Sequence, residues 1–119
     1  MSNRRGAEAE SVFCTWALSR GYDVLFPARG LSPPYDVVIH ADGDYRRVQV
    51  KRAYHRNRSG GKELRVKLTD TGGHKYKTNE VDWFAVVDIE THRIWFFPNT
   101  DGTTNMGLTS GKHDKWLVN

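Results

Sequence analysis

The chain has 119 residues, which is the length of one ordinary domain and leaves no room for a second large core. Hydrophobic residues make up 38% of it and aromatic residues 12%, which excludes a disordered chain. Its apolar runs are short, so we expect neither a membrane span nor a signal peptide. The single cysteine, Cys14, excludes an internal disulfide and a thiolate zinc cluster. We therefore predict one cytosolic domain over residues 1–119.

The net charge of +4 hides a strong asymmetry along the chain. Between Arg46 and Lys77 there are 11 Lys or Arg residues against two acidic ones, Glu63 and Asp70. Such segregation is typical of a polyanionic partner, because neutralising phosphates releases condensed counterions. A solvated basic loop that protects a strand edge is the alternative interpretation.

The first predicted element is a helix that begins at a cap on Ser2 or Asn3 and runs to about Arg20. Gly21 suits the left-handed conformation that ends many helices. The apolar face of this helix is expected to carry Ala9, Val12, Phe13, Trp16 and Ala17. Cys14 is expected to be a packed small residue. A short strand over residues 22–26 and a loop over 28–34 should follow.

The rest of the chain alternates between strand patterns and turn patterns. Asp42-Gly43 is a strong hairpin signal between strands at 35–40 and 45–53. Further on, the predicted elements are a turn at 57–61, a strand at 63–68, a loop at 69–79, a hairpin formed by 81–88 and 92–97, a loop at 99–110 and a last strand at 115–118. The whole predicts an α+β domain, a helix against a mostly antiparallel sheet.

The register of the first hairpin follows from its turn. If residues 41–44 close it, His40 faces Tyr45 and Asp36 faces Gln49. Lys51 points to the same face as Gln49, because side chains alternate along a strand. The opposite face would carry an apolar set suited to a core: Tyr35, Val37, Ile39, Val48 and Val50.

The face that carries Asp36, Gln49 and Lys51 has side chains that could bind a divalent cation. Magnesium prefers oxygen ligands, which Asp36, the Gln49 side chain and the Val50 carbonyl supply. Lys51 could orient a water molecule or balance charge on a phosphate, and Glu10 on the helix could complete the ligand set. The alternative is an ordinary solvent-facing hairpin, with a Glu10 that only complements the helix dipole. Five scattered histidines (His40, His55, His74, His92 and His113) lack the paired spacing of a zinc site.

An ordered set of motifs resembles the PD-(D/E)XK nuclease superfamily. The matching residues are Gly6-x-x-x-Glu10, Gly21-Tyr22-x-Val24, Pro27, Tyr35-Asp36, Arg47-Val48-Gln49-Val50-Lys51-x-Ala53, Tyr76 and Glu80 to Val86, ending at Pro98. The chain is most similar to the small Gln-x-Lys branch, which includes a group I intron homing endonuclease. Archaeal Holliday junction resolvases share the general layout.

The resemblance implies a restriction-endonuclease-like α/β core, with a mixed sheet flanked by helices, and metal-dependent hydrolysis of phosphodiester bonds. By position, Glu10, Asp36, Gln49 and Lys51 match the catalytic residues of the family. Tyr35, rather than proline, precedes Asp36, and Gln49 stands where the family often has an acid. The uncharged Gln49 weakens the case for a tight two-metal site.

Basic residues after the second strand of the hairpin are candidates for binding DNA. They are Arg52, His55, Arg56, Arg58, Lys62, Arg65 and Lys67, of which the last three are expected on one face of the next strand. Tyr76 and Asp82 match family-like positions, but a structural role is expected for both.

The leading hypothesis is a Mg²⁺-dependent endonuclease that cuts duplex DNA, site-specific or of the homing type, from a phage or mobile element. Mn²⁺ is the alternative metal. Since one site cuts one strand, we expect a homodimer or a higher homo-oligomer. A Holliday junction resolvase is the second hypothesis. A non-catalytic DNA-binding module on the same scaffold is a third, which the uncharged Gln49 keeps open.

Overall fold

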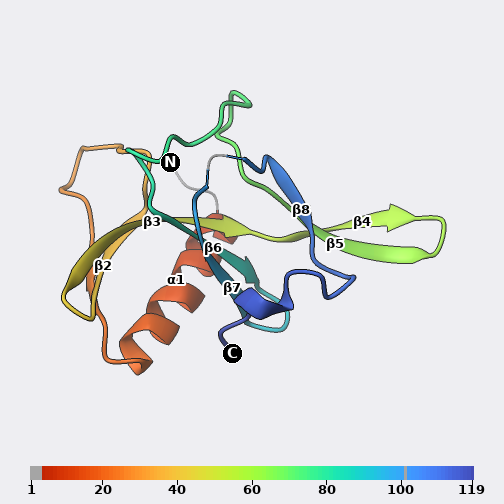
Figure 1. Cartoon of the computed structure of the whole chain (residues 1–119), viewed down its shortest axis with the longest axis horizontal. Coiled ribbons are helices and arrows are strands. Elements are labelled where there is room, and N and C mark those ends of the chain that lie inside the picture. Colours follow the sequence, from red (N-terminus) through yellow and green to blue (C-terminus); the bar gives the residue numbers. More distant parts are fainter. Residues whose placement is uncertain (1–3, 101) are drawn as a thin grey trace.

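A computed structural model describes residues 4–100 and 102–119 of the chain. Helix α1 comes first, and a five-stranded sheet and a three-stranded sheet follow (Figure 1). No helix in the described part of the chain has the length and apolar character that crossing a membrane requires. The bounds are α1 Arg4–Ser19, β1 Asp23–Leu25, β2 Val37–Ala41, β3 Asp44–Arg52, β4 Tyr54–Arg58, β5 Gly61–Lys67, β6 Trp83–Asp88, β7 Arg93–Pro98, β8 Asn105–Gly107 and the 3₁₀ turn η1 Asp114–Trp116.

The larger sheet has the strand order β1-β2-β3-β6-β7. All neighbouring strands in it are antiparallel except β3 and β6, which are parallel. A parallel pair needs a long crossover, and here β4 and β5 are part of it. The predicted mixed, mostly antiparallel sheet with an N-terminal helix is confirmed.

Helix α1 covers one face of this sheet. Ala9, Phe13 and Ala17 recur every four residues and are fully buried. After the helix, Gly21 has a φ of 81°, and the Tyr22 N–H donates to the carbonyl of Ala17 over 3.1 Å. This is the predicted glycine stop in its left-handed form. The predicted caps, Ser2 and Asn3, lie outside the described residues.

The first hairpin has the predicted register. His40 pairs with Tyr45, and both Asp42 and Gly43 have positive φ, as a two-residue type I′ turn requires. Four valine and isoleucine side chains on one face pack toward α1: Val37, Ile39, Val48 and Val50. The predicted place of Tyr35 is wrong. It packs with Ala53 and Phe84 in a second core, on the face of the sheet that α1 does not cover. Tyr35 precedes the first residue of β2, so the alternation of the strand does not extend to it.

The second sheet, in the order β4-β5-β8, differs most from the sequence predictions. Residues 99–110 were expected to form a loop, yet they contain β8, which pairs with β5. Strand β4 was not expected as a separate element, because four of its five residues are exposed and it lacks apolar alternation. Both strands exist through their pairing with β5 rather than through their own residues.

The second core lies on the face of the larger sheet that α1 does not cover. Its buried residues are Ala53, Val66, Leu68, Val81, Phe84, Val86, Trp95, Phe97, Met106 and Leu108. The three-stranded sheet and the C-terminal segment supply part of this packing. The resemblance implied a sheet flanked by helices, and α1 is the one α-helix in the described residues.

The C-terminal segment was predicted to add a strand over 115–118. Instead, η1 makes a 3₁₀ turn, and Leu117 forms a single antiparallel bridge with Trp95 of β7. The Asn119 side chain accepts a hydrogen bond from the Ile94 N–H over 2.8 Å and donates to the His92 carbonyl over 2.7 Å. The Val118 N–H also donates to the Ile94 carbonyl over 3.0 Å, so backbone and side-chain contacts together attach the C-terminal segment to β7.

Candidate active site

Asp36 stands at the entry to β2, held by two backbone contacts with β3. Its N–H donates to the Val48 carbonyl over 2.9 Å, and its carboxylate Oδ2 accepts the Val50 N–H over 2.9 Å. Continuing the register of Val37 with Val48 places Asp36 opposite Gln49. The pKa of Asp36 is raised overall, because the effect of burial exceeds the lowering by the Val50 hydrogen bond and by the charge of Lys51. The carboxylate is therefore oriented before any ligand binds.

Lys51 lies two residues after Gln49 on β3, and its ammonium group is held by the loop between β5 and β6. Nζ donates to the Thr69 carbonyl over 2.8 Å and to the Tyr76 hydroxyl over 2.9 Å. Burial lowers the pKa of Lys51, while the charges of Asp36 and Asp70 raise it. The two hydrogen-bond acceptors are uncharged, so they fix the ammonium without a salt bridge.

Tyr76 contributes more than the structural role expected from the sequence. Burial and the charges of Asp36 and Asp70 raise the pKa of its phenol to about 12, so it remains a neutral hydroxyl. Its ring also packs edge-on against Phe84 of β6, with ring centroids 5.8 Å apart. The packing of the ring places the hydroxyl against Lys51. Family position was the only sequence signal for Tyr76, because 25 residues separate it from Lys51.

Glu10 lies on α1, close enough to Asp36 for the two charges to interact. Burial raises its pKa, and the charge of Asp36 raises it further. Cys14, one helical turn later, has its pKa raised by burial and by the charges of Glu10 and Asp36. The structure thus brings the helix glutamate near the strand aspartate. Cys14 packs against the core under α1, as predicted, and its thiol stays protonated.

Gln49 supplies the amide of the predicted ligand set. Its Nε2 lies 3.4 Å from the Val50 carbonyl oxygen, a long contact. In the described residues no three His, Cys, Asp or Glu side chains come together to hold a metal ion. The predicted set has only two such residues, Glu10 and Asp36, and its remaining donors are amide and backbone oxygens. Oxygen donors of this kind fit magnesium rather than zinc.

Arg47 and Asp82 brace the strands that carry the site. The Asp82 carboxylate accepts from Arg47 Nε, from Arg47 Nη2 (both 2.9 Å) and from the Arg47 backbone N–H (2.8 Å). Asp82 also donates its own N–H to the Arg47 carbonyl. The Arg47 guanidinium holds the pKa of Asp82 below its usual range. This agrees with the structural role expected for Asp82.

The predicted DNA-binding residues divide between the faces of the β4–β5 hairpin. Tyr54 pairs with Arg65 and Arg56 pairs with Glu63, so one face carries Tyr54, Arg56, Arg58, Glu63, Arg65 and Lys67. His55 and Lys62 point to the other face. The prediction that Lys62 shares a face with Arg65 and Lys67 is wrong, because Lys62 lies three positions before Arg65 and five before Lys67, and side chains alternate along a strand. Arg52, at the end of β3, is half-buried, and its Nε has no hydrogen-bond partner.

His40, which the alternation placed on the Asp36 face, lies near the turn of the first hairpin. Its ring stacks on Tyr45, with centroids 4.3 Å apart, and Nδ1 is 3.7 Å from the Asp23 carboxylate. It takes no part in the group around Asp36.

Three comparisons with known proteins give concordant results. A family model described as PD-(D/E)XK endonuclease matches residues 1–111. Protein 5.3 of Escherichia phage T7 is 32% identical over 112 residues, which span 94% of this chain and 92% of the phage protein. The solved structure of a bacterial homing endonuclease, I-Ssp6803I, superposes with a TM-score of 0.71 at 24% identity. That match covers 91% of this chain and 76% of the solved chain, and it shows a shared fold.

Proposed function

This chain belongs to the PD-(D/E)XK endonuclease family, and we propose on that basis that it is a Mg²⁺-dependent enzyme that cuts duplex DNA. Glu10, Asp36, Gln49 and Lys51 are the proposed catalytic residues. The observation that carries the proposal is the fixed lysine: Thr69 and Tyr76 hold the Lys51 ammonium on the side of β3 that faces Asp36. Lys51 is half-buried, and burial of an ammonium group is costly, so lysine is an unusual residue for a purely structural role at this position.

The residues around Asp36 fit a divalent cation. Burial and the charge of Asp36 raise the pKa of the half-buried Glu10 carboxyl. Among the described residues, neither the Glu10 carboxylate nor Asp36 Oδ1 has a hydrogen-bond partner. Asp36, Gln49, Glu10 and the Val50 carbonyl would hold the ion. When bound, Mg²⁺ supplies positive charge that polarises a phosphate and a water molecule. Mn²⁺ has the same preference for oxygen donors and should substitute for it.

The protein residues have separable tasks in this mechanism. Asp36, oriented by the Val50 N–H, would hold the metal ion at a defined place beside β3. Lys51 donates toward the phosphate or the attacking water, and its lowered pKa makes the release of a proton easier than from an exposed lysine. Tyr76 and Thr69 keep the ammonium from swinging into solvent.

The substrate is proposed to be duplex DNA cut at a defined site. The homing endonuclease that shares the fold and the phage relative support a role in mobile or phage DNA. One such site cuts one strand, so cutting both strands would need two copies of the chain. We therefore propose a homodimer or a higher homo-oligomer as the active form.

The test is cleavage of supercoiled plasmid with Mg²⁺, comparing the parent protein with Lys51→Ala and Asp36→Ala. Only the parent should produce nicked or linear DNA, and both variants should still bind DNA without metal. Lys112→Ala, which removes an exposed lysine elsewhere, is the matched control and should cut normally. Full cleavage by Lys51→Ala would refute the assignment. A parent that binds but never cuts, across divalent metals and substrates, would instead indicate a non-catalytic DNA-binding module.

A further inference from the structure

Glu63 on β5 is a nearly buried carboxylate outside the catalytic group, and three arginines surround it. Its side chain is 9% exposed. Oε2 lies 2.9 Å from Arg58 Nη1 and 3.4 Å from Arg56 Nη2, and Oε1 accepts from Arg65 Nη1. Arg65 and Arg58 hold the pKa of this carboxyl below its usual range. Three cations around one anion leave a net charge of about +2 on this face.

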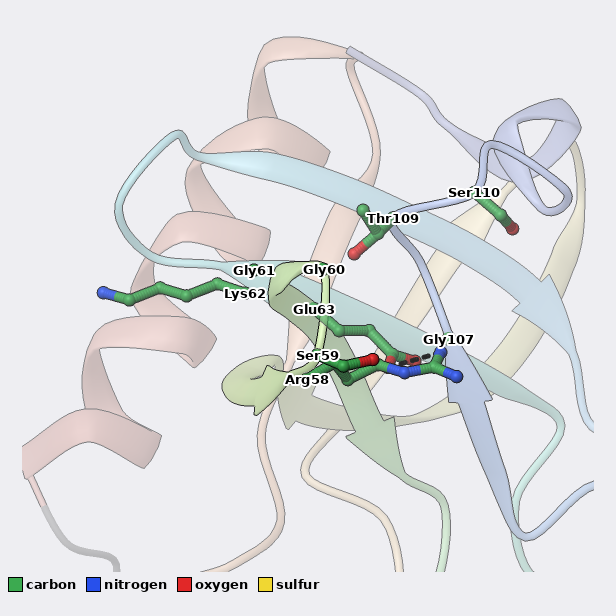
Figure 2. A pocket seen from close by; sticks show the side chains of 9 residues that line it. All are labelled: Arg58, Ser59, Gly60, Gly61, Lys62, Glu63, Gly107, Thr109 and Ser110. Carbon is green, nitrogen blue, oxygen red and sulfur yellow. Dashed lines mark hydrogen bonds and ion pairs between the residues drawn. The ribbon is translucent and has the colours of Figure 1, made fainter.

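The surroundings of Glu63 are shaped to fit this group. Figure 2 shows Glu63 and Arg58 beside Gly107 of β8. These residues line a hollow of about 500 Å³ near the hairpin tip. A Cβ at position 107 would lie 3.0 Å from Glu63 Oε1 and 3.1 Å from Arg65 Nη1. Glycine therefore gives the carboxylate and the guanidinium the room they need. Arg65 also donates through Nη2 to the Asn105 side chain on β8.

The three arginines differ in exposure, and the difference separates their tasks. The Arg65 side chain is 17% exposed, with both of its terminal nitrogens bonded within the protein. The Arg56 side chain is 52% exposed and the Arg58 side chain 63% exposed. Arg65 thus balances Glu63 internally. Arg56 and Arg58 contact the same carboxylate and keep most of their N–H donors in solvent.

The face of the β4–β5 hairpin that carries Arg56, Arg58 and Arg65 is called the arginine face below. Two neighbouring hollows connect it with Lys51. One hollow of about 390 Å³ is lined by Tyr54, Arg56, Arg65, Lys67 and Thr69, among others. A second, of the same size, is lined by Lys51, Arg52, Tyr54, Lys67 and Thr69, among others. They share Tyr54, Lys67 and Thr69, so a groove leads from Lys51 to Arg56. Arg58 lies seven positions after Lys51 in the sequence, so the two Cα atoms are at most about 25 Å apart. That distance is the length of about seven base pairs of duplex DNA.

We propose that Glu63 is a positioning residue that holds Arg56 and Arg58 ready to bind the phosphate backbone of duplex DNA beside the cleaved bond. The inference rests on the proposed function, which supplies the DNA. It goes beyond that function in two ways. It assigns the contact with DNA beside the cleaved bond to Arg56 and Arg58, and it assigns the positioning of their side chains to Glu63. The β4–β5 hairpin projects along the long axis of the molecule, where a duplex could pass beside it (Figure 1). Restrained arginines lose less side-chain entropy on binding than free ones.

The decisive variant is Glu63→Gln, because two interpretations predict opposite signs. It makes the protein one unit more positive. If Glu63 only weakened the positive field, affinity for duplex DNA would rise. If Glu63 organises the arginines, affinity should fall about tenfold, while the cleavage rate at saturating DNA stays that of the parent. Glu90→Gln, an equal charge change at an exposed acid on the β6–β7 turn, should leave affinity unchanged or slightly higher.

Further measurements separate positioning from general damage. The melting temperature should show that Glu63→Gln is folded, and Glu63→Asp should restore part of the affinity. Asn105→Ala, which leaves the charge unchanged and frees one end of Arg65, should weaken binding in the same direction and keeps the test available if Glu63→Gln unfolds. In the Arg56→Ala/Arg58→Ala background, Glu63→Gln should cost nothing more. That double variant should also reduce the slope of log affinity against log salt by about 1.8.

The results divide cleanly. Binding by Glu63→Gln that equals or exceeds that of Glu90→Gln would overturn the inference, and so would an undiminished effect in the double variant. A parent protein that neither binds nor cuts duplex DNA would reject the proposed function itself, and with it this inference.

Discussion

Lys51 is a half-buried and Glu63 a buried charged side chain, and the protein surrounds them in opposite ways. Lys51 bonds to two neutral oxygens, the Thr69 carbonyl and the Tyr76 hydroxyl, and its pKa falls. Glu63 is bonded by cations, and its pKa also falls. For a base this shift makes the neutral form easier to reach, whereas for an acid it fixes the charge. Burial beside neutral partners therefore makes the neutral amine of Lys51 easier to reach, whereas charged partners keep Glu63 ionised.

The largest effect on the cleavage rate is expected for Lys51→Met, which keeps the aliphatic chain and removes the ammonium group. Cleavage should fall by at least about a hundredfold, because a positioned proton donor or acceptor contributes that much. Single-turnover rates at saturating DNA and Mg²⁺ measure it. Lys51→Arg should fail nearly as badly, because a guanidinium cannot lose its proton. An active Lys51→Arg would show that only the charge matters and would end the contrast with Glu63.

Asp82 extends the contrast to stability, since it is an acid with a charged partner and no proposed role in chemistry. Asp82→Asn should destabilise the protein by about 2 kcal/mol, because hydrogen bonds to Arg47 lose their charge. The folded pKa of Asp82 is depressed, so its contribution is complete above about pH 4 and is lost as the pH falls through the folded value. Urea unfolding at pH 7 and at pH 3 should show a gap between parent and variant that narrows in acid. A gap that widens in acid would contradict this account.

Glu10 offers an intermediate case, an acid beside another acid rather than beside a cation. Glu10→Gln should raise the Mg²⁺ concentration for half-maximal cleavage by about tenfold, because one anionic donor is lost. At saturating Mg²⁺ the rate should recover most of its value. Cleavage measured across a Mg²⁺ titration is the readout, and Glu8→Gln, exposed on the same helix, is the control. Equal Mg²⁺ dependence in both variants would remove Glu10 from the ligand set.

The smallest effect is expected for Tyr76→Phe, which removes one of the two acceptors of the Lys51 ammonium. The cleavage rate should fall about fivefold, the equivalent of one net hydrogen bond of about 1 kcal/mol. DNA affinity should not change, because Tyr76 lies outside the arginine face. Tyr45→Phe, far along the first hairpin, should cut normally. A loss of affinity without a loss of rate would place Tyr76 in DNA binding instead.

The sequence predicted the first hairpin and its register well, for a physical reason. Valine and isoleucine on one face can be buried against α1 in only one alternation, and Asp42-Gly43 sets the turn. Two strong local signals agreed there. Asp36, Gln49 and Lys51 could therefore be placed on one face before any coordinates.

The second sheet could not be predicted in the same way. Strand β4 is almost entirely exposed, and β8 has three residues whose only strand partner is β5, about 40 positions earlier. Glu63 is buried by arginines rather than by apolar side chains, a case that hydrophobic alternation does not detect. The contact between Tyr76 and Lys51 depends on how a long loop returns to β3, which no local pattern encodes.

Arg47 and Asp82 are hydrogen-bonded to each other at the two ends of a long segment. This segment contains β4, β5 and the loop whose Thr69 and Tyr76 bind the Lys51 ammonium. The hairpin turn at Ser59 and Gly60 lies far from both ends of this segment, and its residues are exposed. Residues at the tip can therefore be exchanged or inserted while the anchored ends stay in place. Such a division would let relatives acquire new target preferences without rebuilding their chemistry.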